Sequence, residues 1–506
     1  GKINFTAPLT MVGAYAGVSI SDQINTFLKQ GWKMILFGVF VMTGTFVFSA
    51  IIAQMGFMAA GAILEVNMAD LRITHVSVLK EDGTILKDQT VDVTDGRFSK
   101  IAPASESSLK VKEPGKAAPQ VLDGCGKLLM PGLADCHMHT GQQLLKGRVL
   151  DELPMIWTRI MLPFESTLTP EKMKLSAQLA ALEMIRSGTT AFIDAGSYHM
   201  KEAVKVYDKA GLRGTLSLST MDEKGLPESI ATTTEEAVAR ADDFYEFCGG
   251  YKRLKSAYAL RSLISCSESL IRQITEHADD RQALLQAHMN EYPGEVNFFL
   301  QHFKMRPYEY LDSLRVLSDR FIGAHSIMVS AHERSILHER NVQVCHCPFS
   351  NCAKGVPETP ALLEDGICVG LGTDGAAHGG LSLWNEMKIF RSVMNVKHGV
   401  AQSDPAIMPA AQIISMVTKE GYHLMKEDGG IIAEGKKADF ITINIMQPHL
   451  YPTGNLVNTL LECVTASDVC DMVVDGRLLM KNREILTLDE EKIFYEAMKY
   501  MEEVNT

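Results

Sequence analysis

The sequence predicts an α/β fold, in which a (β/α)₈ TIM barrel of parallel strands carries a small β-sandwich domain built from both of its flanks. Three observations support this prediction. Strand-like and helix-like stretches alternate over about 300 residues, as in a parallel sheet covered by helices. Short β-like runs precede and follow this region, and polar residues recur where its strand-like runs end.

Length and charge limit the classes of protein to consider. A chain of 506 residues is too long for one compact core, so more than one folding unit is expected. The formal net charge is −12, and the chain has no basic stripe or arginine-rich tail. Nucleic acid is therefore excluded as the main partner, because phosphate binding needs clustered Lys and Arg.

Residues 1–67 differ from the rest of the chain. Residues 34–53 contain no charge, and a run of this length is sufficient for a helix to cross a bilayer. A buried soluble helix is the alternative, but the run has no polar face. We therefore expect residues 1–67 to be a hydrophobic appendage with a transmembrane helix at 34–53, fused to an enzyme that begins at Met68.

The remaining chain divides by pattern. Residues 68–130 and 431–486 alternate apolar and polar residues in short runs, with a turn signal at Asp95-Gly96, and predict one composite β domain. Residues 131–430 contain the alternation expected of the barrel. Residues 487–506 have the spacing of an amphipathic C-terminal helix.

The segment PGLADCHMH places His137 and His139 two residues apart at the end of the first predicted barrel strand. Residues i and i+2 of a strand face the same way, so both imidazoles can reach one ion. Two histidines at this spacing also occur in packed cores, and the pair alone is weak evidence. Its position at a carboxyl strand end, where barrels carry their chemistry, favours a metal site.

Four later strand-like runs also end in a polar residue of the metal-binding kind. These residues are His288, His325, His346 and Asp374. One such histidine is usually a packing residue, but a series of them at successive strand ends is hard to explain by packing. Three imidazoles and one carboxylate suit Zn²⁺ or Fe²⁺ rather than Mg²⁺ or Ca²⁺. We predict one divalent metal, with Zn²⁺ as the first choice.

Glu291 follows His288 by three residues. Taken alone, it would be a solvated glutamate that favours the dipole at the start of a helix. Beside a metal it would be a general acid and base, and this second interpretation is favoured by the neighbouring histidines.

At these residues the chain resembles the amidohydrolase superfamily, in the branch of chlorotriazine hydrolases, adenosine-type deaminases and guanine deaminase. The resemblance extends from about Met68 to the C-terminus. It is carried by PGLADCHMH, HMNE, GAHSIMVS, HCPFSN, LGTDGA, GGIIAEGKKADFITI and VVDGR.

The resemblance implies a catalytic metal and a set of residues that move protons. The implied metal ligands are His137, His139, His288 and Asp374. His325 would orient the attacking water, Glu291 would protonate the ring nitrogen and then the leaving amine, and Asp374 would accept the proton of the water. A bound dication lowers the pKa of water to about 7, so hydroxide is present at neutral pH. The expected reaction is hydrolytic deamination of a purine, nucleoside or pterin.

Two groups of residues indicate different substrates. Near Trp157 and Glu165 the chain is similar to methylthioadenosine and S-adenosylhomocysteine deaminases, where the matching glutamate holds ribose hydroxyls and the tryptophan walls the site. Arg261 and Gln142 instead match guanine deaminase, whose arginine faces the purine carbonyl. A guanidinium fork suits a carbonyl, which adenine lacks, so an oxo-purine or a pterin is favoured. A structural salt bridge and an ordinary loop amide are the alternatives.

His346 completes the predicted substrate-binding set. Two other functions stay open: a triazine-type dechlorinase or N-dealkylating hydrolase, and a membrane-anchored binding protein without activity. We expect a catalytic part in the cytoplasm, a membrane tether through residues 34–53, and assembly as a homo-oligomer.

Overall fold

The computed structural model describes residues 70–106, 119–152 and 156–505, all within the unit Met68–Thr506. The predicted appendage 1–67 and its span 34–53 lie outside the described residues. Within the described ranges, no helix is long and apolar enough to cross a membrane.

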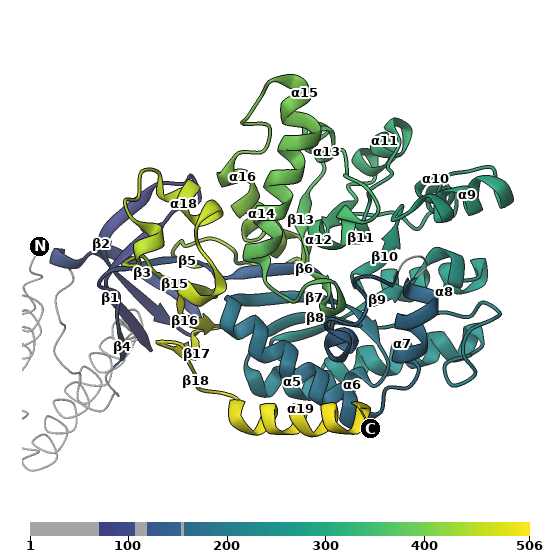
Figure 1. The fold of residues 1–506 in the computed structure, drawn as a ribbon, viewed down its shortest axis with the longest axis horizontal. Coiled ribbons are helices and arrows are strands. Elements are labelled where there is room, and N and C mark those ends of the chain that lie inside the picture. Colours follow the sequence, from purple (N-terminus) through teal and green to yellow (C-terminus); the bar gives the residue numbers. More distant parts are fainter. Residues whose placement is uncertain (1–69, 107–118, 153–155, 506) are drawn as a thin grey trace, which may run out of the picture. The chain divides into compact units, whose positions relative to one another are not determined.

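The central sheet is parallel, and its strands β6 to β11 are seen beside one another in Figure 1. Its strand order is β13-β12-β11-β10-β9-β8-β7-β6-β14. The bounds are β6 Leu133–His139, β7 Thr189–Ser197, β8 Arg213–Leu218, β9 Leu254–Leu260, β10 Leu285–Met289, β11 Phe321–His325, β12 Gln343–His346, β13 Val369–Leu371 and β14 Asp374–Gly375.

The two ends of this sheet meet within one stretch of chain. Strand β13 pairs with β12, and β14, which begins three residues after β13 ends, pairs with the first barrel strand β6. Between them, a Cβ at Gly372 would lie 2.6 Å from the carbonyl oxygen of His137, so only glycine allows this approach. The prediction of an α/β fold like a TIM barrel is therefore confirmed.

Helices follow the barrel strands and cover the outside of the sheet. Helix α5 shows how the sequence sets their ends: the Thr169 hydroxyl accepts from the Lys172 N–H, Pro170 follows, and Gly188 ends the helix with φ of 84°. The larger helices are α5 Pro170–Ser187, α6 Met200–Ala210, α7 Thr234–Cys248, α8 Glu268–Asp280, α9 Pro293–His302, α10 Pro307–Ser313, α11 Ala331–Glu339, α14 Leu383–Met394, α16 Ala410–Met416 and α18 Leu456–Glu462. The shorter α4 Leu162–Glu165, α12 Pro348–Cys352, α13 Thr359–Glu364, α15 Val400–Gln402 and α17 Lys419–Leu424 lie in the connections.

Strands from both flanks of the barrel form one further sheet. Its order is β18-β17-β16-β15-β5-β1-β2-β3, with β4 paired to β1. Antiparallel pairing of β5 with β15 joins the N-terminal flank to the C-terminal flank. The strands are β1 Leu71–Leu79, β2 Ile85–Thr94, β3 Arg97–Pro103, β4 Gln120–Asp123, β5 Lys127–Pro131, β15 Phe440–Asn444, β16 Val469–Val474, β17 Arg477–Lys481 and β18 Glu484–Ile485. This pairing gives one composite sheet and does not confirm a sandwich of two sheets.

The last helix, α19 (Glu490–Asn505), lies along α5 (Figure 1). Its Tyr500 packs with Leu144 and Leu175. Nε of Arg186 on α5 donates to Oε1 of Glu490 at 3.2 Å. The C-terminal helix therefore packs against α5 and against the segment that directly follows β6.

Candidate metal and substrate site

A cavity of about 670 Å³ lies at the carboxyl ends of the barrel strands. His139, His288, His325 and Asp374 line it from the strand side, as do Glu291 and Lys354. A second cavity of about 450 Å³ lies beside β7 and β8 and contains none of the predicted site residues.

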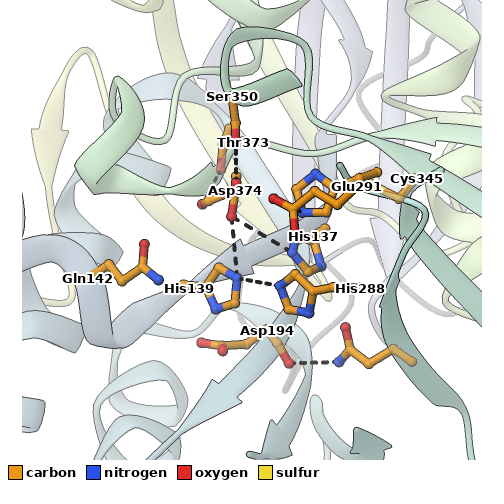
Figure 2. A network of polar contacts seen from close by, with 12 residues as sticks. His137, His139, Gln142, Asp194, His288, Glu291, Cys345, Ser350, Thr373 and Asp374 are labelled. Carbon is orange, nitrogen blue, oxygen red and sulfur yellow. Dashed lines mark hydrogen bonds and ion pairs between the residues drawn. The ribbon is translucent and has the colours of Figure 1, made fainter. Parts of the chain in front are cut away.

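Four side chains predicted as metal ligands converge at the strand ends (Figure 2). Nε2 of His139 lies 3.1 Å from Nε2 of His288 and 3.3 Å from Oδ1 of Asp374. Nε2 of His137 lies 3.9 Å from the same Asp374 oxygen. These residues come from β6, β10 and β14, so closure of the sheet brings them together.

Local structure holds this cluster rigidly. Oδ1 of buried Asp135 accepts from the backbone N–H groups of His137 and Thr373 at 3.2 and 3.1 Å, and Oδ2 accepts from the Thr373 hydroxyl at 2.6 Å. This carboxyl therefore ties β6 to the start of β14. Asp374 and His325 both have positive φ, 59° and 67°, which is a strained conformation often found at functional sites.

The buried nitrogens fit a divalent cation. Neither ring nitrogen of His137 has a hydrogen-bond partner among the described residues. Burial and the neighbouring histidines hold the pKa of His137 and of His288 well below the usual value, so both rings are neutral. Neutral imidazoles beside a carboxylate are the donor set that Zn²⁺ or Fe²⁺ uses, and unpartnered buried nitrogens otherwise cost stability.

Glu291 and His325 form a charged pair beside the cluster. Oε1 of Glu291 lies 3.6 Å from Nε2 of His325, whose Nδ1 lies 3.0 Å from Oδ1 of Asn351. Burial alone would lower the pKa of His325, but Glu291 and Cys347 together outweigh burial and raise this pKa to about 10. Burial opposes ionisation of Glu291 too, and the charges of His325 and Lys354 overcome it, so its pKa is lowered.

Sequence reasoning missed Ser350 and Lys354. The Ser350 hydroxyl donates to Oδ2 of Asp374 at 2.6 Å, and Nζ of Lys354 lies 2.5 Å from Oε1 of Glu291. Both residues belong to the segment 350–354, which begins four residues after β12. The only available signal was the cluster of polar residues in HCPFSN and the lysine just beyond it.

Arg261 and Glu165 form a buried ion pair. Nη2 of Arg261 donates to Oε1 of Glu165 at 3.0 Å, and the same oxygen accepts from Nε2 of Gln142 at 3.1 Å. Oε2 of Glu165 accepts from the Ser197 hydroxyl at 2.8 Å. Nη1 of Arg261 also lies 2.7 Å from Nδ1 of His139. The pair thus connects the substrate residues to the metal cluster.

The predicted substrate residues divide into two groups. Gln142, Trp157 and Arg261 line the cavity. Glu165 does not, because its carboxylate is turned into the ion pair. His346 does not line it either: the ring is buried, and its Nδ1 donates to the carbonyl oxygen of His325 at 2.7 Å.

Trp157 opens a short π-helical turn, Trp157–Met161, on the wall that faces the strand ends. The other residues of this wall are mainly apolar: Val149, Leu150, Ile156 and Met161 line it together with Thr158. The cavity therefore has one polar side and one apolar side.

Comparison with known proteins agrees with this geometry. Residues 128–479 match the model of the amidohydrolase family. The chain is 33% identical to 5-methylthioadenosine/S-adenosylhomocysteine deaminase of Dictyoglomus thermophilum, over 75% of this chain and 88% of that protein. It is 34% identical to 5'-deoxyadenosine deaminase of Methanothermobacter thermautotrophicus, over 83% of this chain and 95% of that protein.

Among solved structures, an adenosine deaminase from Xanthomonas campestris with bound zinc has a TM-score of 0.80. The two chains are 24% identical, and the match covers 86% of this chain and 99% of the other. The predicted resemblance is thus confirmed, as is the predicted class of enzyme, a hydrolytic deaminase.

Proposed function

The chain belongs to the amidohydrolase family, and we propose that it removes an amino group by metal-dependent hydrolysis from a purine-type ring. Adenosine-type nucleosides are the first substrates to test, because the relatives are named for them. One observation carries the proposal: the four candidate metal ligands meet at one cavity, which three of them and the pair Glu291–His325 line.

The metal would be held by His137, His139, His288 and Asp374. Zn²⁺ is proposed first, since the similar Xanthomonas campestris structure contains zinc, and Fe²⁺ is the alternative. When bound, such a dication lowers the pKa of a bound water to about 7 and so supplies the nucleophile at neutral pH. The buried, unpartnered nitrogens of His137 support this assignment.

Glu291 is proposed to carry protons. Its lowered pKa means that it begins as a carboxylate, which would accept a proton from the attacking water and then pass this proton to a ring nitrogen of the substrate. His325 lies beside Oε1 of Glu291 and would orient the attacking water by hydrogen bonding. Asp374 would hold the metal through Oδ1, because Oδ2 accepts from the hydroxyl of Ser350.

The ring itself is less closely defined. Arg261 lines the cavity, which favours a carbonyl on the substrate and makes an oxo-purine or a pterin the second candidate. Its ion pair with Glu165 weakens that argument, because the guanidinium already has a carboxylate partner. We therefore place adenosine-type rings first. A triazine hydrolase and a binding protein without activity are not favoured by the named relatives.

The direct test is a screen for ammonia release. The full chain, loaded with Zn²⁺ or with Fe²⁺, is incubated with purines, their nucleosides, pterins and amino- or chlorotriazines. Ammonia from a purine nucleoside is the expected result. Chloride release from a chlorotriazine without ammonia from any ring would favour the triazine alternative, and no reaction with either metal would refute the deaminase.

The cytoplasmic location, the homo-oligomer and the membrane tether through residues 34–53 stay predictions. The predicted domain limits at 67/68, 130/131, 430/431 and 486/487 also stay predictions.

A further inference from the structure

We propose that Lys354 is a positioning residue for the reaction, and that it holds Glu291 directly and Asp374 through Ser350. The proposal rests on the function proposed above. Its basis is geometric: one ammonium group contacts Glu291 and, through the hydroxyl of Ser350, is linked to Asp374.

The contacts have a consistent direction. Nζ of Lys354 donates to Oε1 of Glu291 at 2.5 Å and to the hydroxyl oxygen of Ser350 at 2.8 Å. The single hydroxyl hydrogen of Ser350 is given to Oδ2 of Asp374 at 2.6 Å, so its oxygen is available to accept from the lysine. Hydrogen bonds to charged groups of this kind are short and about twice as strong as neutral ones.

We call the contacts from Lys354 to Glu291, and through Ser350 to Asp374, the relay. It holds one oxygen of each carboxylate and leaves the other oxygen for the reaction. Oε1 of Glu291 faces Lys354 and His325, so Oε2 is the oxygen left to meet a substrate. Oδ2 of Asp374 faces Ser350, and Oδ1 faces His137 and His139. A loose carboxylate would exchange these oxygens by rotation, and the relay prevents this.

One short segment supports all three residues that manage protons. Ser350 holds Asp374, Asn351 contacts His325, and Lys354 holds Glu291. The backbone fixes the spacing, because the N–H of Lys354 donates to the carbonyl oxygen of Asn351 at 2.8 Å after helix α12. The segment 350–354 is thus joined to residues on or just after three strands, β10, β11 and β14, whereas an isolated salt bridge would join it to only one.

The first experiment compares Lys354→Met with Lys146→Met. Lys146 also contacts a carboxylate, Oε2 of Glu183 at 2.6 Å, but it lies outside the cavity. The substrate is whichever purine nucleoside the screen identifies, and turnover is followed by the ultraviolet absorbance of the ring. We expect kcat of Lys354→Met to fall about 100-fold with little change in KM, as for a misplaced catalytic group. Lys146→Met should match the wild type.

Chemical rescue separates positioning from a structural role. Lys354→Ala should regain at least part of its lost kcat when methylammonium or ethylammonium is added, because a free ammonium ion can occupy the vacated space. The Lys146→Met enzyme should not respond. Wild-type kcat in Lys354→Met, or a folded Lys354→Ala enzyme that neither amine improves, would overturn the proposal.

A measurement without substrate keeps the two proposals apart. Ser350→Ala and Lys354→Met should each weaken Zn²⁺ binding, the former by about 10-fold, since residues that orient a metal ligand contribute this much to affinity. If the wild type deaminates nothing, the proposed function fails and Zn²⁺ affinity still decides the relay. Unchanged Zn²⁺ affinity in Ser350→Ala would refute the contact of Lys354 with Asp374 through Ser350, even if Lys354→Met does not fold.

Discussion

On its polar side, the cavity presents charged and imidazole groups at the ends of strands or in the segments just after them, whereas the connection between β6 and α5 supplies its mainly apolar side. The polar side is His139, His288, His325, Glu291, Lys354 and Asp374, with His137 behind them. The apolar side is Val149, Leu150, Ile156, Trp157 and Met161.

The two sides are fixed by different forces. Strand pairing and the pleat set the direction of the histidines and of Asp374 on the polar side, so their geometry follows from barrel closure. The apolar side depends on packing: Val149 and Met161 bury against Leu145 and Ala377. A change on the polar side should therefore alter the chemistry, and a change on the apolar side should alter substrate binding.

Metal removal should have the largest effect, because it takes away the ion that the polar side surrounds. Treatment with a chelator should abolish ammonia release, and added Zn²⁺ should restore it. The unfolding temperature should fall and recover in parallel, since a metal at 100 times its Kd adds about 2.7 kcal/mol to stability. Full activity in protein shown by metal analysis to be metal-free would contradict the site.

Glu291→Gln should have the next largest effect. Glutamine keeps the shape of the side chain but cannot carry a proton, so kcat should fall by about 10²- to 10⁴-fold. Zn²⁺ content should stay equal to that of the wild type. Glu339→Gln, at the exposed end of α11, is the matched control. Undiminished turnover in Glu291→Gln would remove this residue from the mechanism.

The difference between the sides also explains what the sequence could predict. His137, His139 and His288 stand on strands whose alternation is visible in the sequence, so their convergence follows from the fold class. The composite β domain was harder: its strand-like runs could be found, but not that β5 would pair with β15 in one sheet. Partners in a mixed sheet are chosen by packing between distant segments.

Contacts between distant loops were the part that could not be predicted. Glu165 resembles a ribose-binding residue, yet the fold brings Arg261 beside it from 96 positions along the chain. His346 ends a strand like the other candidates, but its ring turns to the carbonyl oxygen of His325. No strand or helix pattern in the sequence indicates where Lys354 lies, because its position depends on the turn after α12.

The buried ion pair of Arg261 with Glu165 gives a third prediction. Arg261→His leaves Glu165 buried without its cation, and breaking such a pair costs about 3–5 kcal/mol of unfolding free energy. Replacing both residues, Arg261→Met with Glu165→Met, should lower the free energy of unfolding by less than the sum of the losses in Arg261→Met alone and Glu165→Met alone. Denaturant unfolding measures both values. Additive costs would show that the two side chains do not interact.

The same variant tests substrate choice. If Arg261 binds a carbonyl group of the substrate, Arg261→His should raise kcat/KM for adenine-type rings relative to kcat/KM for oxo-purines. An unchanged ratio together with lost stability would make Arg261 a structural residue, which its contact with Glu165 also allows.

The smallest effect is expected on the apolar side, at Trp157. Trp157→Leu removes part of the wall that covers the substrate but touches none of the polar groups, so kcat should stay close to that of the wild type. KM should rise about 10-fold, which corresponds to about 1.4 kcal/mol of binding free energy. Phe494→Leu, an aromatic residue of α19 that is 52% exposed and outside the cavity, is the control. A fall in kcat of Trp157→Leu with unchanged KM would mean that the apolar side also orients the reacting groups, and the division between the two sides would fail.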